Sequence, residues 1–496
     1  MLENNIINSG EIKKFAVGQA VVETRVPIES NDGGGECKLL SASAHVVTTP
    51  SEVFAGEVRY AGKVKFDILV LCDGKVECMS AVAEFTDKIT SPDIVGGMNV
   101  ALASDVINCE SAMERGAIKV VAVVDTAVYG VVGSTVEPIS GAEDGVFTDN
   151  KAVEYCSLVT SATENTYTSD SVPCGKAEEI LCSYSRVVLT NAECGDDEVK
   201  ITGNVFTFVT MRGEDGKVSY ERVTTPFIKS VGLSGVVAED VAVCRATVTD
   251  SSALLVTDDE CRIETAATVQ IYITVFARKT CEIAVDAFSP THAVETEAVN
   301  IPTFSIEPSV TVMDVIDGQI KLEADMPAAD GIVAVGNTFC TVTNAHIDGR
   351  VNVEGLVGGD IVYYNTDRGA VDTVSFRLPF SMPIAIDTNA QDVDLSAVVT
   401  DVTVRIRRES VFDVKAEIAF TATCTTCGSA TALKSVKVGE EIARPDATVI
   451  VHIARPGETL WQAAKALGCP PNRVTEQNSA SAPYAGGERL VHFCGK

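Results

Sequence analysis

The chain contains the stretch Gly62-Lys63-Val64-Lys65-Phe66-Asp67-Ile68-Leu69-Val70, and this stretch decides the fold class. Val64, Phe66, Ile68 and Val70 occupy every second position, which is the period of a β-strand with one buried face. Asp73-Gly74 follows, and a return run extends from Val76 to Phe85. Because glycine adopts positive φ without a Cβ penalty, the sequence predicts a β-hairpin that turns at Gly74.

The same pattern occurs twice more, beginning at Gly203 and at Gly355, with turns at Asp215-Gly216 and Asp367-Arg368-Gly369. In every copy a valine lies two residues after the turn glycine, and a phenylalanine lies eleven residues after it. The valines are Val76, Val218 and Val371, and the phenylalanines are Phe85, Phe227 and Phe380. The phenylalanines are 142 and 153 residues apart, far longer than a solenoid period, so each copy is expected to be a domain with its own core.

These repeats predict a mainly β protein with three tandem β-sandwich-like domains, at residues 1–140, 141–292 and 293–436. A closed barrel is the alternative topology for each domain. Three segments are expected to be linkers, namely 133–150, 288–302 and 421–438, and residues 1–20 are expected to form a short helix or an arm. Three aspartates, Asp105, Asp250 and Asp401, recur in phase and are expected to serve turns or caps.

Composition limits the partners and the compartment. The 496 residues carry a formal net charge of −30, which argues against binding nucleic acid or anionic lipid surfaces. The sequence shows neither a signal peptide nor an apolar run long enough to cross a bilayer, so we expect an intracellular protein without membrane insertion. Its sixteen cysteines are scattered, and free thiols in a reducing compartment are the expectation.

The carboxyl-terminal segment 446–496 differs from the repeats and is called the tail module below. Its pattern predicts a strand at 449–454, a helix from Thr459 to Leu467 closed by Gly468, a helix from Pro470-Pro471 to about Gln477, and a strand at 489–493. This is a small α+β (βααβ) unit. From Lys437 onward the chain has seven Lys and Arg against six Asp and Glu, so the remainder carries −31.

The repeats resemble the SPOCS domain of spore-coat and sporulation proteins, through the glycine-ended strand, the Asp-Gly hairpin, the Pro-Phe pair and the last alternating run. The first copy departs from this pattern with Glu84 in place of the proline, and the third with Gly358-Gly359 in its first strand. The tail module resembles a LysM domain, through Pro456-Gly457-Glu458-Thr459-Leu460-Trp461, Ala464, Asn478 and Gly487-Glu488-Arg489-Leu490. It departs from the LysM pattern at Glu458, where aspartate is usual, and at His452 and Ala454, where larger apolar residues are common.

The LysM resemblance implies a shallow groove that binds N-acetylglucosamine units of peptidoglycan or chitin, or a protein instead. Its candidate residues are Gly457, Glu458, Thr459, Leu460, Asn478, Pro483 and Tyr484. The single tryptophan, Trp461, is expected to lie in the core of the module. Cys469 and Cys494 could meet in space and are expected to stay reduced.

No pattern in the sequence pairs a nucleophile with a base, and the five histidines are dispersed, so no enzyme activity, metal or cofactor is expected. Cys424 and Cys427 have the spacing of half a zinc site or of a redox pair, but two ordinary thiols are expected. The combined resemblances imply a non-catalytic adaptor of endospore formation, in the mother-cell cytoplasm, at the forespore surface or in the spore coat. Its implied partner is a spore-coat scaffold ATPase of the stage IV sporulation protein A type. The alternative is a peptidoglycan-binding protein of the spore or cell envelope.

Overall fold

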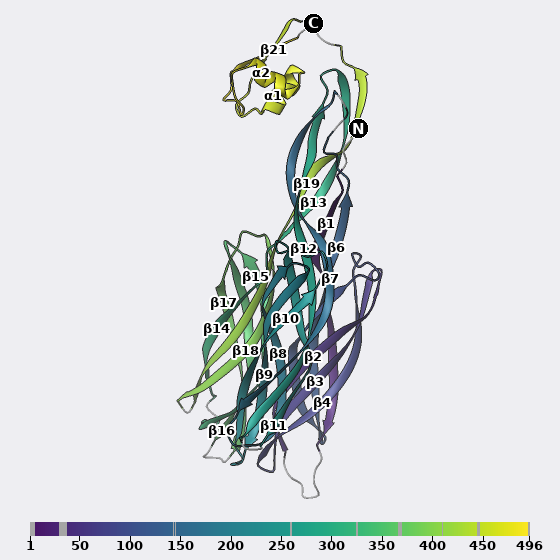
Figure 1. The fold of residues 1–496 in the computed structure, drawn as a ribbon. Helices are drawn as coiled ribbons and strands as arrows, with labels where there is room; N and C mark the ends of the chain where they lie inside the picture. The colour runs from purple at the N-terminus through teal and green to yellow at the C-terminus, as the bar shows by residue number, and fades with distance from the viewer. Residues whose placement is uncertain are drawn as a thin grey trace.

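A computed structural model describes the chain except residues 1–4, 29–36, 142, 144, 258–259, 324–325, 366–369, 409, 444–446 and 495–496. The described protein is mainly β, with two short helices near its carboxyl end. Figure 1 shows a broad body of strands, a narrow stalk where several long strands continue past the body, and the tail module near the end of the stalk.

The first repeat has two antiparallel sheets of three strands, in the orders β1-β6-β5 and β2-β3-β4. Its strands are β1 (Ile7–Pro27), β2 (Cys37–Phe54), β3 (Glu57–Cys72), β4 (Lys75–Thr90), β5 (Val100–Glu114) and β6 (Ala117–Val136). The predicted hairpin is β3–β4. Asp73 and Gly74 in its turn have φ of 52° and 79°, the pair of positive angles that a two-residue hairpin turn requires.

The second repeat has the same arrangement, with sheets in the orders β7-β12-β11 and β8-β9-β10. Its strands are β7 (Phe147–Pro173), β8 (Ala177–Gly195), β9 (Glu198–Gly213), β10 (Val218–Gly232), β11 (Val241–Val256) and β12 (Arg262–Phe288). The turn glycine Gly216 has φ of 78°. The second predicted hairpin, β9–β10, is therefore also present.

The third repeat divides one edge strand in two. Its strands are β13 (His292–Ile306), β14 (Val310–Lys321), β15 (Gly331–Ile347), β16 (Arg350–Asn365), β17 (Ala370–Asp387), β18 (Asp392–Arg408) and β19 (Val411–Glu441). On one side β19 pairs with β13 and then β14, and on the other side with β18; β15-β16-β17 form the second sheet. The predicted turn at 367–369 lies outside the described residues.

The repeated glycine and phenylalanine face each other across each hairpin. Gly62 pairs with Phe85, Gly203 with Phe227 and Gly355 with Phe380. A Cβ on Gly62 would lie 2.3 Å from the Phe85 ring. The ring thus covers the glycine backbone on the sheet surface, which explains why the two residue types recur at one spacing.

Each repeat has its own apolar cluster between its sheets, and the three repeats also share one. In the first repeat, Val64, Phe66 and Val120 are fully buried. The shared cluster contains the valines that follow the turn glycines, Val76, Val218 and Val371, together with Leu40, Leu69, Val333, Ala334 and Val362. The repeated valine therefore marks the place where the three hairpins meet.

Side-chain hydrogen bonds also join the repeats. Arg222 of the second repeat donates to Glu417 of the third at 3.0 Å, and Lys65 of the first donates to the Ser183 carbonyl of the second at 3.0 Å. Tyr272 of the second repeat donates to the Asn99 carbonyl of the first at 3.2 Å. The repeats are consequently packed on one another by both apolar and polar contacts.

The stalk is built from the same ends of all three repeats. The first halves of β1 and β7, together with β13, pair there with the last parts of β6, β12 and β19. One buried cluster contains a residue from each of five of these strands: Ile7, Tyr155, Ile283, Ile301 and Ala432. All three repeats thus contribute to one extension of the body (Figure 1).

Several predicted connections are strands. The expected linker 421–438 lies inside β19, and the linker 288–302 is shortened to 289–291 because β13 begins at His292. The linker 133–150 is shortened to 137–146, and most of residues 1–20 belong to β1. Valine, threonine and alanine in these segments find strand partners, so polar composition alone misplaced the boundaries.

The three aspartates expected at turns or caps lie inside strands. Asp250 and Asp401 directly follow irregularities in the ladders of β11 and β18, after Val248 and Val399. In β5 the corresponding place after the irregularity is taken by Asn108, and Asp105 lies before it. Each aspartate lies thirteen residues before the residue that begins the next alternating run, Ile118, Ile263 or Val414, but this shared spacing does not give the three aspartates equal positions in the sheets.

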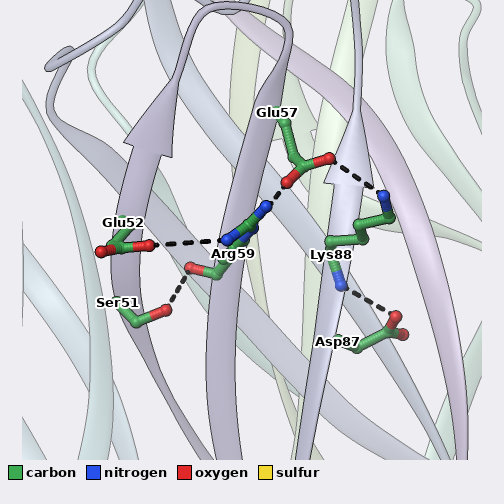
Figure 2. Close-up of polar contacts among 6 residues, drawn as sticks. All are labelled: Ser51, Glu52, Glu57, Arg59, Asp87 and Lys88. Carbon is green, nitrogen blue, oxygen red and sulfur yellow. Dashed lines mark hydrogen bonds and ion pairs between the residues drawn. The ribbon is translucent and has the colours of Figure 1, made fainter.

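Charged side chains pair with one another on β3 and β4 of the first repeat. Glu57 accepts hydrogen bonds from Arg59 at 2.7 Å and from Lys88 at 3.0 Å, as Figure 2 shows. These bonds lower the pKa of the Glu57 carboxyl. Such exposed pairs contribute little to stability, so the apolar clusters are the main stabilising element of the repeat.

Candidate functional site

The tail module has the predicted order of elements: β20 (Val449–Ile453), α1 (Leu460–Leu467), α2 (Pro471–Gln477) and β21 (Arg489–Phe493). Thr459 caps α1 in a capping box with Gln462, and Gly468 ends the helix with φ of 62°. β20 and β21 form an antiparallel pair. The local signals at Thr459 and Gly468 therefore set the helix bounds where the sequence predicts them.

The predicted groove residues divide into an exposed group and a structural group. Gly457, Thr459 and Pro483 are exposed, and Leu460 is half-buried. By contrast, Tyr484 is only 2% exposed and belongs to the core of the module. The predicted binding groove stays a prediction, but only part of its residue set is open to a ligand.

Asn478 has a structural task within the module. Its side-chain nitrogen donates to the carbonyls of Val474 and Val491, each at 2.9 Å, and its side-chain oxygen accepts from the Val491 amide at 2.7 Å. These bonds tie the end of α2 to β21. The amide group of Asn478 is thereby occupied inside the module.

The two loops of the predicted groove are joined by their backbones. The Gly457 amide donates to the Tyr484 carbonyl at 2.8 Å, and the Tyr484 amide donates to the Glu458 carbonyl at 3.0 Å. Backbone groups at this contact are therefore paired with each other. A sugar placed at this contact would have to use other donors and acceptors.

Two of the three departures from the LysM pattern, His452 and Glu458, are joined by one hydrogen bond. Glu458 is 8% exposed, and its carboxylate is 2.8 Å from His452 Nε2 and accepts from the Arg455 amide at 2.6 Å. Burial raises the pKa of the Glu458 carboxyl, but the Arg455 and His452 hydrogen bonds outweigh it, so the net pKa is lowered. The glutamate at position 458 and the histidine at position 452 thus interact directly with each other.

An apolar face of the two-stranded sheet is open to solvent. Val449 pairs with Phe493, and Val451 with Val491, so these side chains share a face with Ile453. Val449, Val451, Ile453 and Phe493 are 40%, 56%, 62% and 54% exposed. We call these residues, with Val491, the outer sheet face. None of the groove residues predicted from the sequence lies on this face, although the alternation of apolar residues in 449–453 indicates it.

Trp461 contacts the second repeat and is only half-buried, so it is not simply a core residue of the tail module. Its ring packs edge-on against Phe288 near the end of β12, with ring centroids 4.9 Å apart. Its indole nitrogen donates to Asp286 at 2.9 Å, and Lys465 donates to the same carboxylate at 2.8 Å. Phe147 of β7 lies in the same cluster. The tail module is thus docked on the stalk through the second repeat.

A cavity of about 280 Å³ lies where the repeats meet, lined by β2, β5, β8, β11, β15, β18 and β19. Two arginines in its wall are bound to acceptors of the protein itself. Arg186 donates to the Val399 carbonyl at 3.1 Å, and Arg245 pairs with Asp394. These interactions again join the second repeat to the third.

Two titratable groups in the cavity wall are shifted toward their neutral forms. Burial lowers the pKa of His45, and the charges of Arg186 and Lys65 lower it further. Asp105 is an exposed residue of the cavity wall, and desolvation by the protein around it raises the pKa of its carboxyl, while the charge of Arg186 lowers this pKa and that of Asp125 raises it. The His45 ring stacks on Tyr184 at 4.2 Å between centroids. The His45 ring is thus placed by a contact between the first and second repeats.

The cysteines depart from expectation at one pair. Cys37 and Cys72 form a disulfide across β2 and β3, so the expectation of free thiols throughout is wrong. Sequence spacing did not reveal it, since the pair depends on strand register.

Cys424 and Cys427 lie in β19, the first buried and the second exposed. Residues three apart in a strand point to opposite faces, so these two thiols do not form a joint site. Cys469 and Cys494 are free thiols, and burial together with Cys494 raises the pKa of Cys469 to about 11.

Within the described part of the chain, no group of three or more His, Cys, Asp or Glu side chains is arranged to hold a metal ion. No described helix is long and apolar enough to cross a membrane. Comparison with family models, with curated proteins and with solved structures finds no match for this chain.

Proposed function

We propose that this chain is a non-catalytic adaptor of endospore formation, a SPOCS-like and LysM-like protein that tethers a coat scaffold protein at the forespore surface. Three repeats packed into one elongated body give it the form of a tether. The observation that carries the binding proposal is the outer sheet face, where four apolar side chains are 40–62% exposed. Apolar surface of this kind favours a protein partner.

The tail module is favoured as the binding part for two further reasons. From Lys437 onward the net charge is +1, while the remainder carries −31, so the module approaches an acidic or neutral protein with less repulsion. The candidate groove, by comparison, has its Glu458 and Tyr484 side chains buried and its loop backbones paired with each other. The resemblance names the scaffold ATPase as the partner, and the exposed Gly457, Thr459 and Pro483 keep glycan binding as the alternative.

The experiment titrates the full chain with the scaffold ATPase and, separately, with N-acetylglucosamine oligomers. We expect micromolar protein binding that Val451→Glu abolishes, because it places a charge in the middle of the outer sheet face. The control is Arg473→Gln on exposed α2, which should leave binding unchanged. Tight glycan binding with no ATPase binding would replace the adaptor proposal with the peptidoglycan-binding one.

A further inference from the structure

Two cysteines of the second repeat face each other at the end of a ladder. Pro173 and Arg262 are the last register pair of β7 and β12, and Cys174 and Cys261 are the next residues on the two chains. The Cys174 amide donates to the Cys261 carbonyl at 2.9 Å. Their sulfurs are 3.1 Å apart, with the Cys174 thiol donating to Cys261 Sγ. The two thiols are therefore already in contact.

The disulfide of the first repeat has a related geometry. Cys37 and Cys72 are also directly opposite each other in an antiparallel pair, with Cα atoms 4.3 Å apart. Opposed residues in such ladders have Cα separations of about 4.5–5.5 Å, and disulfides span about 4.4–6.8 Å. Because Cys174 and Cys261 follow the last register pair and are joined by a backbone hydrogen bond, we expect their Cα separation to suit a disulfide without strand movement.

We propose that Cys174 and Cys261 are an oxidation site that forms an intramolecular disulfide by exchange with a low-molecular-weight disulfide. The Cys261 thiolate attacks one sulfur of the small disulfide, whose S–S bond breaks and releases one small thiolate, which takes up a proton. The Cys174 thiolate then attacks Cys261 Sγ in the mixed disulfide and expels the second small thiol. Two protein thiols are oxidised, and one small disulfide is reduced to two thiols.

The surroundings favour this order of steps. Cys261 accepts the hydrogen bond from Cys174, which makes Cys261 the better first nucleophile. Burial and this hydrogen bond raise the pKa of Cys174 to about 11, so Cys174 keeps its proton until the mixed disulfide forms. Both side chains are half-buried, and they pack beside Met211 and Ile263. A small disulfide can reach them, whereas the apolar neighbours hold the two sulfurs together.

The new bond would close a segment of 87 residues within the second repeat. It joins the end of β7 to the start of β12, and the strands β8 to β11 lie between the two cysteines in the sequence. Because a cross-link over a long segment restricts the unfolded chain, oxidation is expected to raise the unfolding temperature.

The test incubates the folded full chain with oxidised and reduced glutathione at graded ratios, alkylates the remaining thiols, and maps peptides by mass spectrometry without reduction. We expect a linked Cys174–Cys261 peptide pair, lighter by two hydrogens than the separate thiol peptides, and release of two reduced glutathiones for each link. Exposed Cys427 should be alkylated throughout and serves as the internal control. In Cys261→Ser, Cys174 should be alkylated and the link absent.

Two results would overturn the proposal. One is alkylation of both Cys174 and Cys261 at a ratio of oxidised to reduced glutathione at which Cys37 and Cys72 are fully linked. The other is glutathione retained on either cysteine without closure of the ring. The measurement on the unsubstituted chain decides the matter even if the serine variant folds poorly, and circular dichroism before and after oxidation verifies that the chain stays folded.

Discussion

The indole nitrogen of Trp461 donates a hydrogen bond of 2.9 Å to the Asp286 carboxylate, and this bond joins the tail module to the second repeat. Trp461 is the only tryptophan in the chain, so its emission reports on the docking directly. We predict that Asp286→Ala releases the module and shifts the emission to longer wavelength. The free energy of docking is expected to weaken by about 1 kcal/mol, since the hydrogen bond has a charged acceptor that is partly open to water.

The control for this docking prediction is Glu295→Gln, which removes one exposed carboxylate from neighbouring β13. Its emission should match that of the unsubstituted chain. If Asp286→Ala also leaves the emission unchanged, the contact between Trp461 and the stalk does not hold the module in solution.

The docking should weaken in acid. Burial raises the pKa of Asp286, but hydrogen bonds from Lys465 and Trp461 outweigh it and lower the net value below the usual 3.8. Because the pKa of Asp286 is lower in the docked state, its charge stabilises docking fully at pH values above the pKa of the undocked carboxyl. This stabilisation is lost as the pH falls through the pKa of the docked carboxyl. We predict a red shift of the Trp461 emission only below about pH 4. Asp286→Ala should lack this acid transition, whereas a transition seen in both proteins would reflect general unfolding.

The pair of His452 and Glu458 should stabilise the tail module. Glu458→Gln removes the charge from a buried acceptor, and we expect a loss of about 1–3 kcal/mol in the unfolding free energy of the module. Combining it with His452→Ala should cost less than the sum of the two single changes, because both remove one interaction. Denaturant unfolding followed by Trp461 emission measures this. Strict additivity would mean that the two side chains do not interact.

The three hairpin glycines should differ in their tolerance of alanine. The three atoms nearest to a Cβ at Gly62 all belong to the Phe85 ring, whereas a Cβ at Gly203 would lie 2.7 Å from the Val188 carbonyl oxygen and one at Gly355 would lie 2.4 Å from that of Thr341. Carbonyls held in a sheet move less than a ring. We predict that the unfolding free energy falls by about 1–3 kcal/mol, with the loss increasing from Gly62→Ala through Gly203→Ala to Gly355→Ala.

The matched control for the glycine series is Gly232→Ala on β10, where an added Cβ has no atom within 4 Å. It should change the unfolding midpoint little. Equal effects at all four glycines would show that backbone entropy, and not contact with the covering phenylalanine, sets the cost.

The opposite member of the glycine pair gives a separate prediction. Phe227 is 7% exposed and lies in the core of the second repeat. Phe227→Ala is expected to cost about 3–5 kcal/mol in the unfolding free energy, the range for a large buried aromatic side chain. A loss below about 1 kcal/mol would contradict its packing over Gly203.

Local patterns predicted the hairpins and the tail module well, because they depend on neighbours in sequence. The turn at Gly74 and the cap at Thr459 are examples. The recurrence of Val76 and its two counterparts was visible in the sequence, but their meeting depends on how whole repeats pack. The disulfide at Cys37 and the docking of Trp461 depend on the same long-range placement. The segment 421–438 was misassigned because its strand partner, β13, lies more than a hundred residues earlier.

The length and direction of β19 have a mechanical consequence. This strand of 31 residues crosses the body, continues through the stalk and ends just before the tail module. A pull on the module, with the body held, acts along the axis of β19 and shears it against β13, while the ladder hydrogen bonds lie across that axis. Many bonds then share the load and must yield together. The weakest link under tension is therefore the contact between Trp461 and Phe288, which can release the module while the body stays folded.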